Sequence, residues 1–403
     1  MNCKITGKKI KPFMSFGKMP IANGFLKKKD FKDEFFFEME VGFSKEVSLF
    51  QLNSHPNPKL MFNKNYPFFT GSSKVMVKHF ANYAKWIKKN YFNHAKNLIE
   101  IGSNDGTFLK NFNSGKIKNI GFEPSKNVAD IATKNGVKTI NKFFNYKNFS
   151  KLKNLKNKTD IICAANAICH VPNLKDLIRG IDYLLHKNGV FIFEEPYLGS
   201  MFKKVSYDQI YDEHIFMFSV SSVKKIFEIF KFDLINIQQQ KTHGGSMRYV
   251  VARSKSHKIN KNVKKFLNYE KKKNINNIKG CLKFKKQCEI SKKKLNNKIN
   301  SFLKKNENIC GYAATSKSTT ILNYCNINHS KIDFVCDTTP EKIGKYTPGT
   351  HIPVVSADHF RKQIPNNTFL FAWNHKKEIF KKEKKFSLNG GKWLTFFPNI
   401  KIW

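Results

Sequence analysis

Short apolar runs of strand length alternate with helical stretches through the middle of the chain. The runs lie at 97–101, 119–123, 159–165, 189–195 and 232–238, and a further one lies near 248–252. Residues 75–90 are expected to form a helix that leads into the first run. Strands that alternate with helices indicate a mostly parallel, doubly wound sheet. The pattern therefore predicts an α/β unit over residues 76–253.

The same alternation returns near the end of the chain and predicts a second, Rossmann-like α/β domain at 308–403. Its strands are expected to begin at Asn308 and Ile332, followed by runs at 352–355, 368–373 and 392–397. Between the two units, residues 254–307 are rich in Lys and carry apolar residues at roughly helical spacing: Leu267, Phe284, Ile290, Leu295, Ile299 and Leu303. They predict a basic helical connector with one packed face, and a disordered basic segment is the alternative. Residues 1–75 predict a small irregular module with a strand at 35–43.

A glycine turn follows the first strand of the middle unit, in Glu100-Ile-Gly-Ser-Asn-Asp-Gly106. Gly102 lets the backbone approach a ligand without a Cβ in the way. Glu123 ends the next strand, where a carboxylate usually accepts both ribose hydroxyls. Because the spacing is not Gly-x-Gly-x-x-Gly, the turn favours a nucleoside with little phosphate, and S-adenosylmethionine is the best candidate. The expected cofactor contacts are Glu100, Gly102, Asn104, Asp105, Gly106, Glu123 and Asn166; an ordinary turn without a nucleotide is the alternative.

Side chains suited to proton transfer follow the later strands. Tyr211, Glu213 and His214 lie shortly after the strand that ends at 195, and His170 follows the strand at 159–165. Loops after strands face the ligand crevice in this kind of sheet, and a His beside a Glu and a Tyr can remove a proton from a substrate. Capping or packed histidines are the alternative. Tyr66 is a further aromatic candidate, which could equally close a core.

Three residues are candidates for holding an anionic substrate. Arg248, in the turn that also contains Ser246, could bind an anionic group in a bidentate manner. Lys317 follows a turn of small residues and could meet a phosphate as a point charge.

The chain has a formal net charge of +44, with 73 Lys and Arg against 29 Asp and Glu. The excess is almost all Lys, is spread along the chain and accompanies many Asn, Phe and Ile residues, which is typical of an AT-rich genome. We therefore expect no specific nucleic acid partner, although nonspecific binding of anions at low salt follows. No apolar run is long enough for a membrane span, and the N-terminus lacks a signal-peptide pattern. Eight scattered cysteines without a Cys-x-x-Cys pair indicate free thiols in a reducing cytoplasm.

The order of motifs resembles the sugar C-methyltransferases of deoxysugar pathways over nearly the whole chain. The similar segments are 19–26, the loop at 100–106, the strand at 121–125, Ile210-Tyr-Asp-Glu-His214, His243-Gly-Gly-Ser-Met-Arg248, 322–324, 346–350 and 372–374. The family combines an N-terminal zinc-binding module, a class I S-adenosylmethionine-dependent methyltransferase domain and a C-terminal Rossmann-like domain.

The resemblance implies C-methylation of a nucleotide-linked 4-keto deoxysugar at the carbon beside the ketone. It implies that His214 is the base, assisted by Glu213 and Tyr211, and that His170 and Tyr66 belong to the active site. A proton beside a ketone is acidic because the enolate spreads its charge onto oxygen. Asp212 replaces a His of the family's signature, which leaves the choice of substrate open.

One departure from the family concerns zinc. The family's module uses two Cys-x-x-Cys pairs, which map here onto Cys3 with Thr6 and onto Ser44 with Val47. One thiolate cannot close a tetrahedral zinc site, so we expect no structural zinc and no other metal.

Two other functions remain open from the sequence alone. An RNA-directed methyltransferase could use the basic surface, but the lysines form no stripe and no base-stacking motif accompanies them. A non-catalytic binding or scaffold relative could have lost the zinc ligands, but it would not need Tyr211, Glu213 and His214. The nucleotide, the sugar and the oligomeric state cannot be derived from the sequence.

Overall fold

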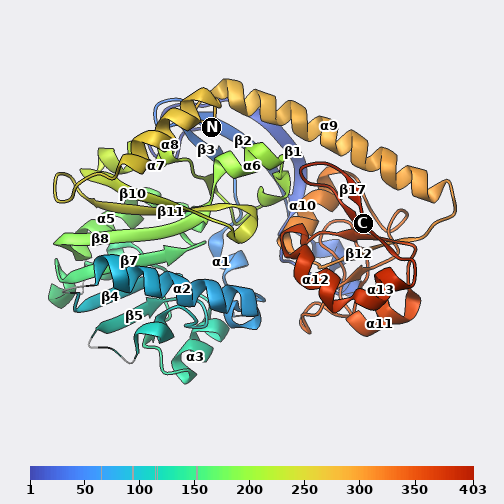
Figure 1. The fold of residues 1–403 in the computed structure, drawn as a ribbon, viewed down its shortest axis with the longest axis horizontal. Coiled ribbons are helices and arrows are strands. Elements are labelled where there is room, and N and C mark those ends of the chain that lie inside the picture. Colours follow the sequence, from blue (N-terminus) through green and yellow to red (C-terminus); the bar gives the residue numbers. More distant parts are fainter. Residues whose placement is uncertain (65, 93–94, 114, 116, 151–152) are drawn as a thin grey trace.

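The computed structural model describes residues 1–403 except 65, 93–94, 114, 116 and 151–152. The described chain forms three sheets, of four, seven and six strands. The seven-stranded and six-stranded sheets lie in the left and right halves of Figure 1, and strands of the first sheet lie behind and between them. Helix α9 (Ile278–Leu303) runs along the top of this view toward the C-terminal half.

The seven-stranded sheet has the order β10-β11-β8-β7-β4-β5-β6. Its strands are β4 (Asn97–Ile101), β5 (Lys118–Phe122), β6 (Thr139–Ile140), β7 (Thr159–Ala165), β8 (Leu185–Pro196), β10 (Phe232–Gln240) and β11 (Ser246–Arg253). Strand β11 pairs antiparallel with both β8 and β10, and the remaining pairs are parallel. The predicted doubly wound α/β sheet is confirmed, with one reversed strand inserted near its edge.

Two apolar layers cover the faces of this sheet. On β7, Ile162 belongs to the layer with α5 (Leu174–Leu184) and α7 (Val220–Ile229), while Ile161 belongs to the layer with α2 (Lys74–Tyr91). This alternation follows from the period of two in a strand. Helix α5 buries five apolar residues at helical spacing: Leu174, Leu177, Ile178, Ile181 and Leu184. The shorter helices of this unit are α3 (Lys126–Lys134), α4 (Tyr146–Phe149) and α6 (Leu198–Lys204).

In a doubly wound sheet, an α-helix usually follows such a glycine turn. A short 3₁₀ helix, Leu109–Phe112, follows the turn instead. Leu109 and Phe112 are fully buried and fix this segment in the core, while Asn111 and Asn113 are poor helix formers in the same stretch. The turn is therefore fixed mainly by its own hydrogen bonds and by packing.

The N-terminal sheet is not built from residues 1–75 alone. Its order is β1-β2-β3-β9, with β1 (Pro12–Pro20), β2 (Phe36–Ser44), β3 (Leu49–Leu52) and β9 (Phe216–Met217). Strand β9 follows closely after His214 in the chain and pairs with β3. The segment around His214 is thus attached directly to the N-terminal sheet. Helix α1 (Pro58–Met61) then leads toward α2.

The connector consists of α8 (Lys261–Lys272) and the long α9. The predicted packed face is confirmed by the burial of Phe284, Leu295 and Ile299, which join the core of the N-terminal and C-terminal sheets. Ile290 was expected on that face, but it is exposed. Glu270 of α8 is fully buried, and its carboxylate accepts the Val220 and Ser221 amides at the start of α7.

The C-terminal sheet has the order β14-β13-β12-β15-β16-β17. Its strands are β12 (Ile309–Tyr312), β13 (Val335–Cys336), β14 (Val354–Val355), β15 (Asn367–Leu370), β16 (Lys392–Thr395) and β17 (Lys401–Ile402). All pairs are parallel except the edge pair of β16 and β17. The helices α10 (Ser316–Tyr324), α11 (Ala357–Gln363), α12 (Lys376–Lys382) and α13 (Lys384–Leu388) complete the second predicted α/β unit.

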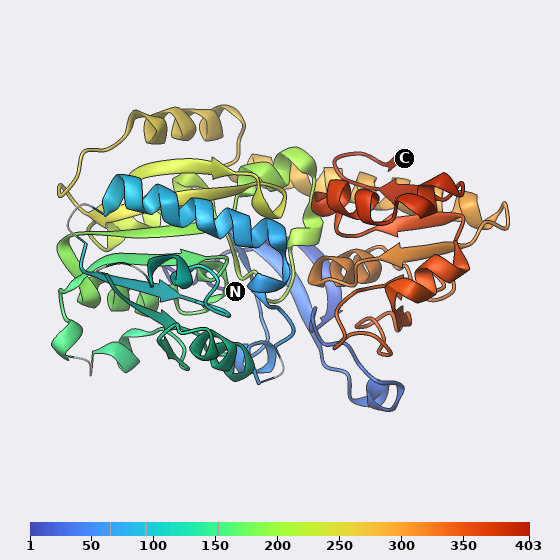
Figure 2. The ribbon, with the colours of Figure 1, turned by 60° about the horizontal axis from the view of Figure 1, so that its bottom comes forward.

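The N-terminal segment reaches the C-terminal sheet by a long excursion that lies at the lower centre of Figure 2. Glu34 accepts hydrogen bonds from Gly349 N and from the His351 ring, both at 2.7 Å. Phe31 stacks on His351 with ring centroids 3.7 Å apart. These contacts join the N-terminal segment to the C-terminal unit.

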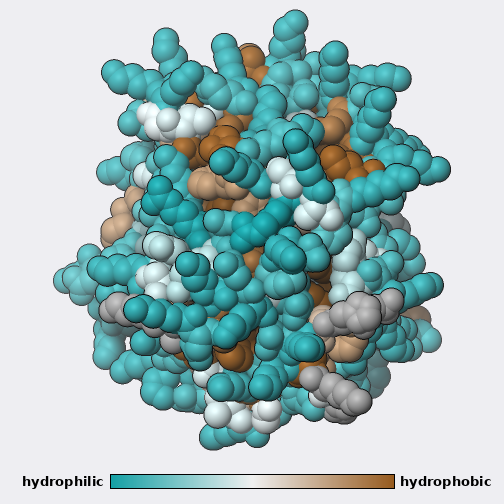
Figure 3. Space-filling view, turned by 90° about the vertical axis from the view of Figure 1, so that its left-hand side faces the viewer, coloured by the Kyte–Doolittle hydropathy of each residue, from teal (hydrophilic) through white to brown (hydrophobic). Residues whose placement is uncertain are grey.

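The outer surface of the seven-stranded unit is mainly hydrophilic, and its apolar residues form small separated areas (Figure 3). All eight cysteines are buried and free. A search of the described residues finds no helix with the length and apolar character that a bilayer span requires.

Candidate active site

A cavity of about 1220 Å³ lies where the three units meet. Its wall contains Asn23 and Tyr66 from the N-terminal part and the turn after β4 from the seven-stranded sheet. It also contains His214 from the segment before β9 and Lys317 from α10. Residues far apart in the sequence thus meet around one enclosed volume of a size suited to small ligands.

The turn after β4 requires glycine at two positions. Gly102 and Gly106 have φ angles of +70° and +78°. A Cβ at Gly102 would lie 2.6 Å from the Ala167 Cβ, and one at Gly106 would lie 2.8 Å from the Val137 side chain. Gly102 N and Ser103 N donate to Phe122 O at the end of β5. The backbone of the turn is therefore fixed at the carboxyl edge of the two strands, with Gly102 on the cavity wall.

Two of the predicted cofactor contacts shape the turn instead. Asp105 and Gly106 do not line the cavity. The Asp105 carboxylate accepts hydrogen bonds from Gly71 N at 2.7 Å and from the Thr107 hydroxyl at 2.6 Å. It thereby ties the turn to the segment before α2, which corrects the predicted roles of Asp105 and Gly106 as direct contacts.

The remaining acidic groups of the turn fit a cationic nucleoside. Glu123 lines the cavity and accepts Asn104 N at 3.1 Å and Ser125 N at 2.8 Å, which leaves lone pairs for ribose hydroxyls. Glu100 is buried, and its Oε2 has no hydrogen-bond partner. Burial, with the nearby Asp105 and Glu123 carboxylates, raises the pKa of Glu100 well above its usual value. A cation such as S-adenosylmethionine bound beside Glu100 would lower this pKa again and favour the ionised carboxylate.

Tyr211 and His214 form a hydrogen-bonded pair on the cavity wall. The His214 Nδ1 lies 2.7 Å from the carbonyl oxygen of Gln209, which can only accept, so Nδ1 carries the proton. The His214 Nε2 then holds a lone pair, and the Tyr211 hydroxyl donates to it at 2.6 Å. The imidazole is thus fixed in one tautomer, with its basic nitrogen directed at the tyrosine.

Glu213 lies beside this pair and is held by the N-terminal part of the chain. The Asn23 amide donates to Glu213 Oε1 at 2.7 Å, and the Tyr66 hydroxyl donates to Oε2 at 3.4 Å. Asp212 is also buried and accepts Ala22 N at 3.2 Å. The loop at Ala22 and Asn23 therefore orients both carboxyls.

His170 completes the cluster at the carboxyl end of β7. Its ring stacks on His214 with centroids 5.3 Å apart and on Phe62 at 5.5 Å. Its Nε2 is buried without a hydrogen-bond partner. The turn that carries it is fixed by Glu195, whose Oε1 accepts the amides of residues 167, 168 and 169. The sequence brings the predicted Tyr66, His170, Tyr211, Glu213 and His214 to one wall of the cavity.

Burial controls the protonation of this cluster. It lowers the pKa of His170 to about 4 and that of His214 well below the usual value, so both imidazoles are neutral near pH 7. Burial also raises the pKa of Glu213 to about 7. Burial and the adjacent Glu213 charge raise the pKa of Asp212. Both carboxyls are thus harder to ionise than usual, while both histidines are neutral.

Arg248 and Ser246 are not in the cavity wall. The Arg248 guanidinium is buried, pairs with Glu194, donates to Gln238 and stacks over Tyr83 at 4.0 Å. Ser246 is buried at the start of β11 and donates to the Thr242 carbonyl at 3.1 Å. The prediction that these residues bind substrate is wrong, because the strand pairing places both inside the protein.

Lys317 also lines the cavity, in the first turn of α10. Its Nζ is buried without a hydrogen-bond partner, 5.6 Å from the centroid of the Trp373 ring. Asp208 is its nearest balancing charge and accepts the Trp373 indole N–H at 2.7 Å. Thr315 caps the helix through its side chain. A buried ammonium at a helix N-terminus is suited to an anionic group.

Several functional candidates were missed in the sequence. Asn23 lies 190 positions from the carboxyl that it contacts. His243 lines the cavity with Asn166, whose amide lies 3.1 Å from the His243 Nε2. The signal for His243 was its place beside two glycines in the 243–248 motif, and no local signal marks Asn23.

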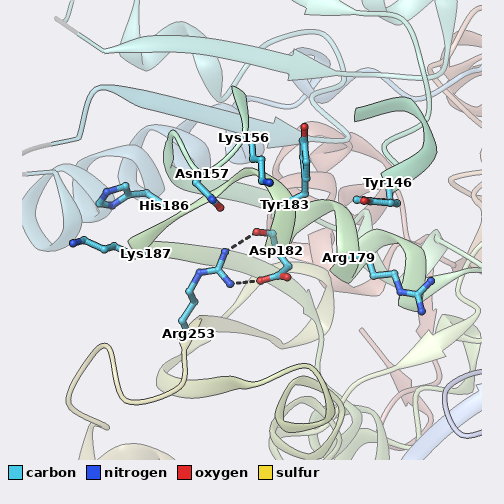
Figure 4. Close-up of a pocket in the computed structure, with 9 residues that line it drawn as sticks. All are labelled: Tyr146, Lys156, Asn157, Arg179, Asp182, Tyr183, His186, Lys187 and Arg253. Carbon is cyan, nitrogen blue, oxygen red and sulfur yellow. Dashed lines mark hydrogen bonds and ion pairs between the residues drawn. The ribbon is translucent and has the colours of Figure 1, made fainter. Parts of the chain in front are cut away.

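A second cavity, of about 890 Å³, is open on the outer surface of the seven-stranded unit (Figure 4). It gathers Lys156, Arg179, Lys187 and Arg253 around Tyr183. Arg253 pairs with Asp182, as the dashed lines show. It has no glycine turn, and its one His, His186, has no buried acid beside it, so it offers fewer groups suited to catalysis than the central cavity.

The four zinc positions of the N-terminal module carry one thiol. Cys3 is buried, and its Sγ accepts the Thr6 amide at 3.4 Å. Ser44 donates to Glu46 at 3.1 Å, and Val47 is buried in an apolar cluster with Cys3. This set does not fit a tetrahedral site. Among the described residues, the group spaced for a metal is Cys169, His170 and His214, which belongs to the active-site cluster.

The fold and site together define the class of protein. A doubly wound sheet with one reversed strand, a glycine turn after its first strand and an acid after the second form the ligand site of a class I S-adenosylmethionine-dependent methyltransferase. Three family models match in chain order: "Putative zinc binding domain" at 3–62, "Methyltransferase domain" at 77–237 and "C-methyltransferase C-terminal domain" at 241–398. The chain is thus an S-adenosylmethionine-dependent C-methyltransferase, with the three matched domains following one another along it.

The chain is similar over nearly its whole length to one curated enzyme and in part to several solved structures. The C-methyltransferase NovU of Streptomyces niveus is 26% identical over 392 residues, which cover 96% of this chain and 93% of NovU. Solved structures with similar folds include the magnesium protoporphyrin IX methyltransferase of Synechocystis PCC 6803 with bound S-adenosylmethionine, at 12% identity and a TM-score of 0.33 over 44% of this chain and 79% of that one. A possible histamine N-methyltransferase from Thermotoga maritima is 20% identical, with a TM-score of 0.33 over 43% and 91% of the two chains.

Proposed function

We propose that this enzyme methylates a nucleotide-linked 4-keto deoxysugar at the carbon beside the ketone. The observation that carries the proposal is the pair of Tyr211 and His214, a neutral imidazole whose basic nitrogen accepts the Tyr211 hydroxyl, on the wall of the cavity that the cofactor turn also lines. Such a pair suits removal of a weakly acidic C–H proton. The resemblance of the motifs to the sugar C-methyltransferases supplies the substrate class.

The proton has a defined route. The Tyr211 hydroxyl occupies the lone pair of the His214 Nε2, so a proton from the substrate would reach Nε2 through Tyr211. We therefore assign a proton relay to the pair. The Tyr211 oxygen takes the proton from carbon as the Tyr211 proton passes to the His214 Nε2, and the C–H electron pair forms the enolate. The Gln209 carbonyl stabilises the resulting imidazolium through Nδ1–H. Gly102, Asn104 and Glu123 would hold S-adenosylmethionine, which would supply an electrophilic methyl group to the carbon.

The C-terminal domain is proposed to hold the nucleotide diphosphate. Lys317 offers a buried ammonium without a hydrogen-bond partner, and the amides at the start of α10 add positive potential. Asp337 follows β13 on the same cavity wall and is suited to a sugar hydroxyl. An extended nucleotide sugar could thus bridge the C-terminal domain and the methyl donor. The volume of about 1220 Å³ suits such a small substrate.

The N-terminal module is proposed to function without structural zinc. The buried side chains of Cys3 and Val47, together with Ile5, Ile10 and Leu49, form an apolar cluster where relatives of the family place metal ligands. This cluster continues into the seven-stranded unit, which stabilises the module by burial of apolar surface.

The proposal is tested by product analysis. The enzyme is incubated with methyl-labelled S-adenosylmethionine and a panel of thymidine-, uridine- and cytidine-diphosphate 4-keto-6-deoxyhexoses, and products are identified by mass and NMR. We expect a single carbon-bound methyl group beside the ketone. Labelling of RNA without labelling of any sugar, or the absence of calorimetric binding of S-adenosylmethionine, would contradict the proposal.

A further inference from the structure

His243 is held in an unusual backbone conformation on the cavity wall. It lies in the 3₁₀ turn Thr242–Gly244 with a left-handed φ of +50°. The neighbouring Gly244 has no room for a side chain, since a Cβ there would lie 2.5 Å from the Trp373 ring. The Lys204 ammonium also donates to the Gly244 carbonyl. Contacts from two domains thus fix a strained turn, which is typical of functional sites.

The environment of the His243 ring selects one tautomer. The Asn166 side-chain amide nitrogen lies 3.1 Å from the His243 Nε2 and donates to it, so Nε2 carries the lone pair and Nδ1 carries the proton. The Nδ1 has no partner within the described chain, and the ring lines the cavity. Burial, with the nearby Lys317 charge, lowers the pKa of His243 to about 3, so the ring is neutral.

This arrangement prevents His243 from acting as a second base and leaves its Nδ1–H as a hydrogen-bond donor. The one lone pair of the neutral ring is occupied by Asn166, so His243 cannot accept a proton from substrate. Its N–H faces a cavity that also contains the Tyr211 and His214 pair. A neutral imidazole N–H is a suitable partner for a ketone that becomes an enolate, because it donates without giving up its proton.

We infer that His243 donates its Nδ1–H to the ketone oxygen of the substrate and stabilises the enolate. The inference rests on the proposed function. As the C–H proton leaves toward Tyr211 and His214, its electron pair forms the carbon–carbon double bond, and the carbonyl pair moves onto oxygen. The His243 hydrogen bond strengthens as this negative charge develops, and no proton leaves the ring.

A matched pair of variants separates this role from packing. In His243→Asn, the amide nitrogen can replace the ring Nδ1, and Asn tolerates a left-handed φ. In His243→Gln, the longer amide reaches instead toward Asn166 and provides no donor at the Nδ1 position. Both variants are first compared with the wild type by thermal unfolding.

The test measures exchange of the proton beside the ketone in deuterated water, without a methyl donor, for the same panel of nucleotide sugars. We expect His243→Gln to lower the exchange rate about 100-fold with little change in sugar binding, and His243→Asn to stay within about tenfold of the wild type. Equal rates for wild type and His243→Gln, or equal losses in both variants, would overturn the role of His243.

A second measurement uses ¹⁵N-labelled histidine. NMR shifts at pH 7 are expected to report a neutral His243 with the proton on Nδ1, and a charged ring or a proton on Nε2 would overturn the inference. A wild-type enzyme that neither exchanges nor methylates any sugar of the panel overturns the proposed function and the role of His243 with it. Normal wild-type exchange with an unaffected His243→Gln variant overturns only the latter.

Discussion

The side-chain amide of Asn23 donates a hydrogen bond to Glu213 Oε1 at 2.7 Å. This contact links the loop after β1 to the active-site segment that runs into β9. The Thr319 hydroxyl of α10 donates to the carbonyl of Ala22 in the same loop at 2.8 Å. The loop therefore touches all three units and places the N-terminal part of the chain in the active site.

Asn23→Ala is expected to shift the pH dependence of catalysis. Burial raises the pKa of Glu213 to about 7, and the Asn23 hydrogen bond opposes this by stabilising the carboxylate. Its loss raises that pKa further, so ionisation of Glu213 requires a higher pH. We expect the acidic limb of kcat/KM to move up by about one pH unit. Thr319→Val is the control, because it removes a bond to the same loop without touching Glu213.

Asp212→Asn is expected to leave the acidic limb in place. Burial and the Glu213 charge raise the pKa of Asp212 well above its usual value, so Asp212 stays neutral while Glu213 ionises. Asn keeps the acceptor for Ala22 N and is also neutral, so the acidic limb of kcat/KM should stay at the wild-type pH. The pH profile of the double variant Asn23→Ala with Asp212→Asn should match that of Asn23→Ala alone. An acidic limb that moves as far in Asp212→Asn as in Asn23→Ala would show that Glu213 alone does not control it.

The sequence predicted those parts of the site that depend on position along a strand. Glu100, Gly102 and Glu123 follow from the rule that ligands bind at the carboxyl ends of parallel strands. Arg248 was misassigned because its partner is set by sheet register, which pairs it with Glu194 on β8. Nothing local distinguishes an arginine facing a cavity from one paired inside the sheet.

In the fold, too, the sequence predicted the periodic elements but not a pairing between distant segments. Period and alternation predicted both α/β units, but not the pairing of β9 with β3, which joins segments more than 160 positions apart. A two-residue strand has no periodicity to recognise. That pairing brings Asn23 near Glu213, so the missing element and the missing site residue have one physical cause.

Glu195→Gln is expected to change the pH dependence of stability. Burial raises the pKa of Glu195 from 4.5 to about 7 in the folded protein. As pH rises through this interval, the unfolded chain ionises first, so the wild type loses stability that the uncharged Gln variant retains. The free energy of unfolding of the Gln variant, relative to that of the wild type, should increase by about 3 kcal/mol between about pH 4.5 and pH 7 and then remain constant. Denaturant unfolding of both proteins across this range measures it.

Glu38→Gln serves as the matched control for this prediction. Glu38 is exposed on β2, so its replacement removes a carboxylate without removing a buried one. A stability difference for Glu195→Gln that is constant across the range would contradict the raised pKa. In Glu195→Gln, the Gln oxygen can accept the same hydrogen bonds from the 167–169 amides, so the turn at His170 is expected to stay intact.

Restoring thiols should create the metal site that the N-terminal module lacks. In the triple variant Thr6→Cys, Ser44→Cys and Val47→Cys, Cys3 gains three partners and the module offers a Cys₄ set. We expect about one zinc ion per chain in this variant by elemental analysis and none above background in the wild type. Cobalt substitution should give the absorption of tetrahedral thiolate coordination only in the triple variant. Val47→Cys alone is the control, since two thiols cannot close the site.

Stoichiometric zinc in the wild type would contradict the proposal of a module held by apolar packing. Cys169, His170 and His214 would then be the candidate zinc ligands.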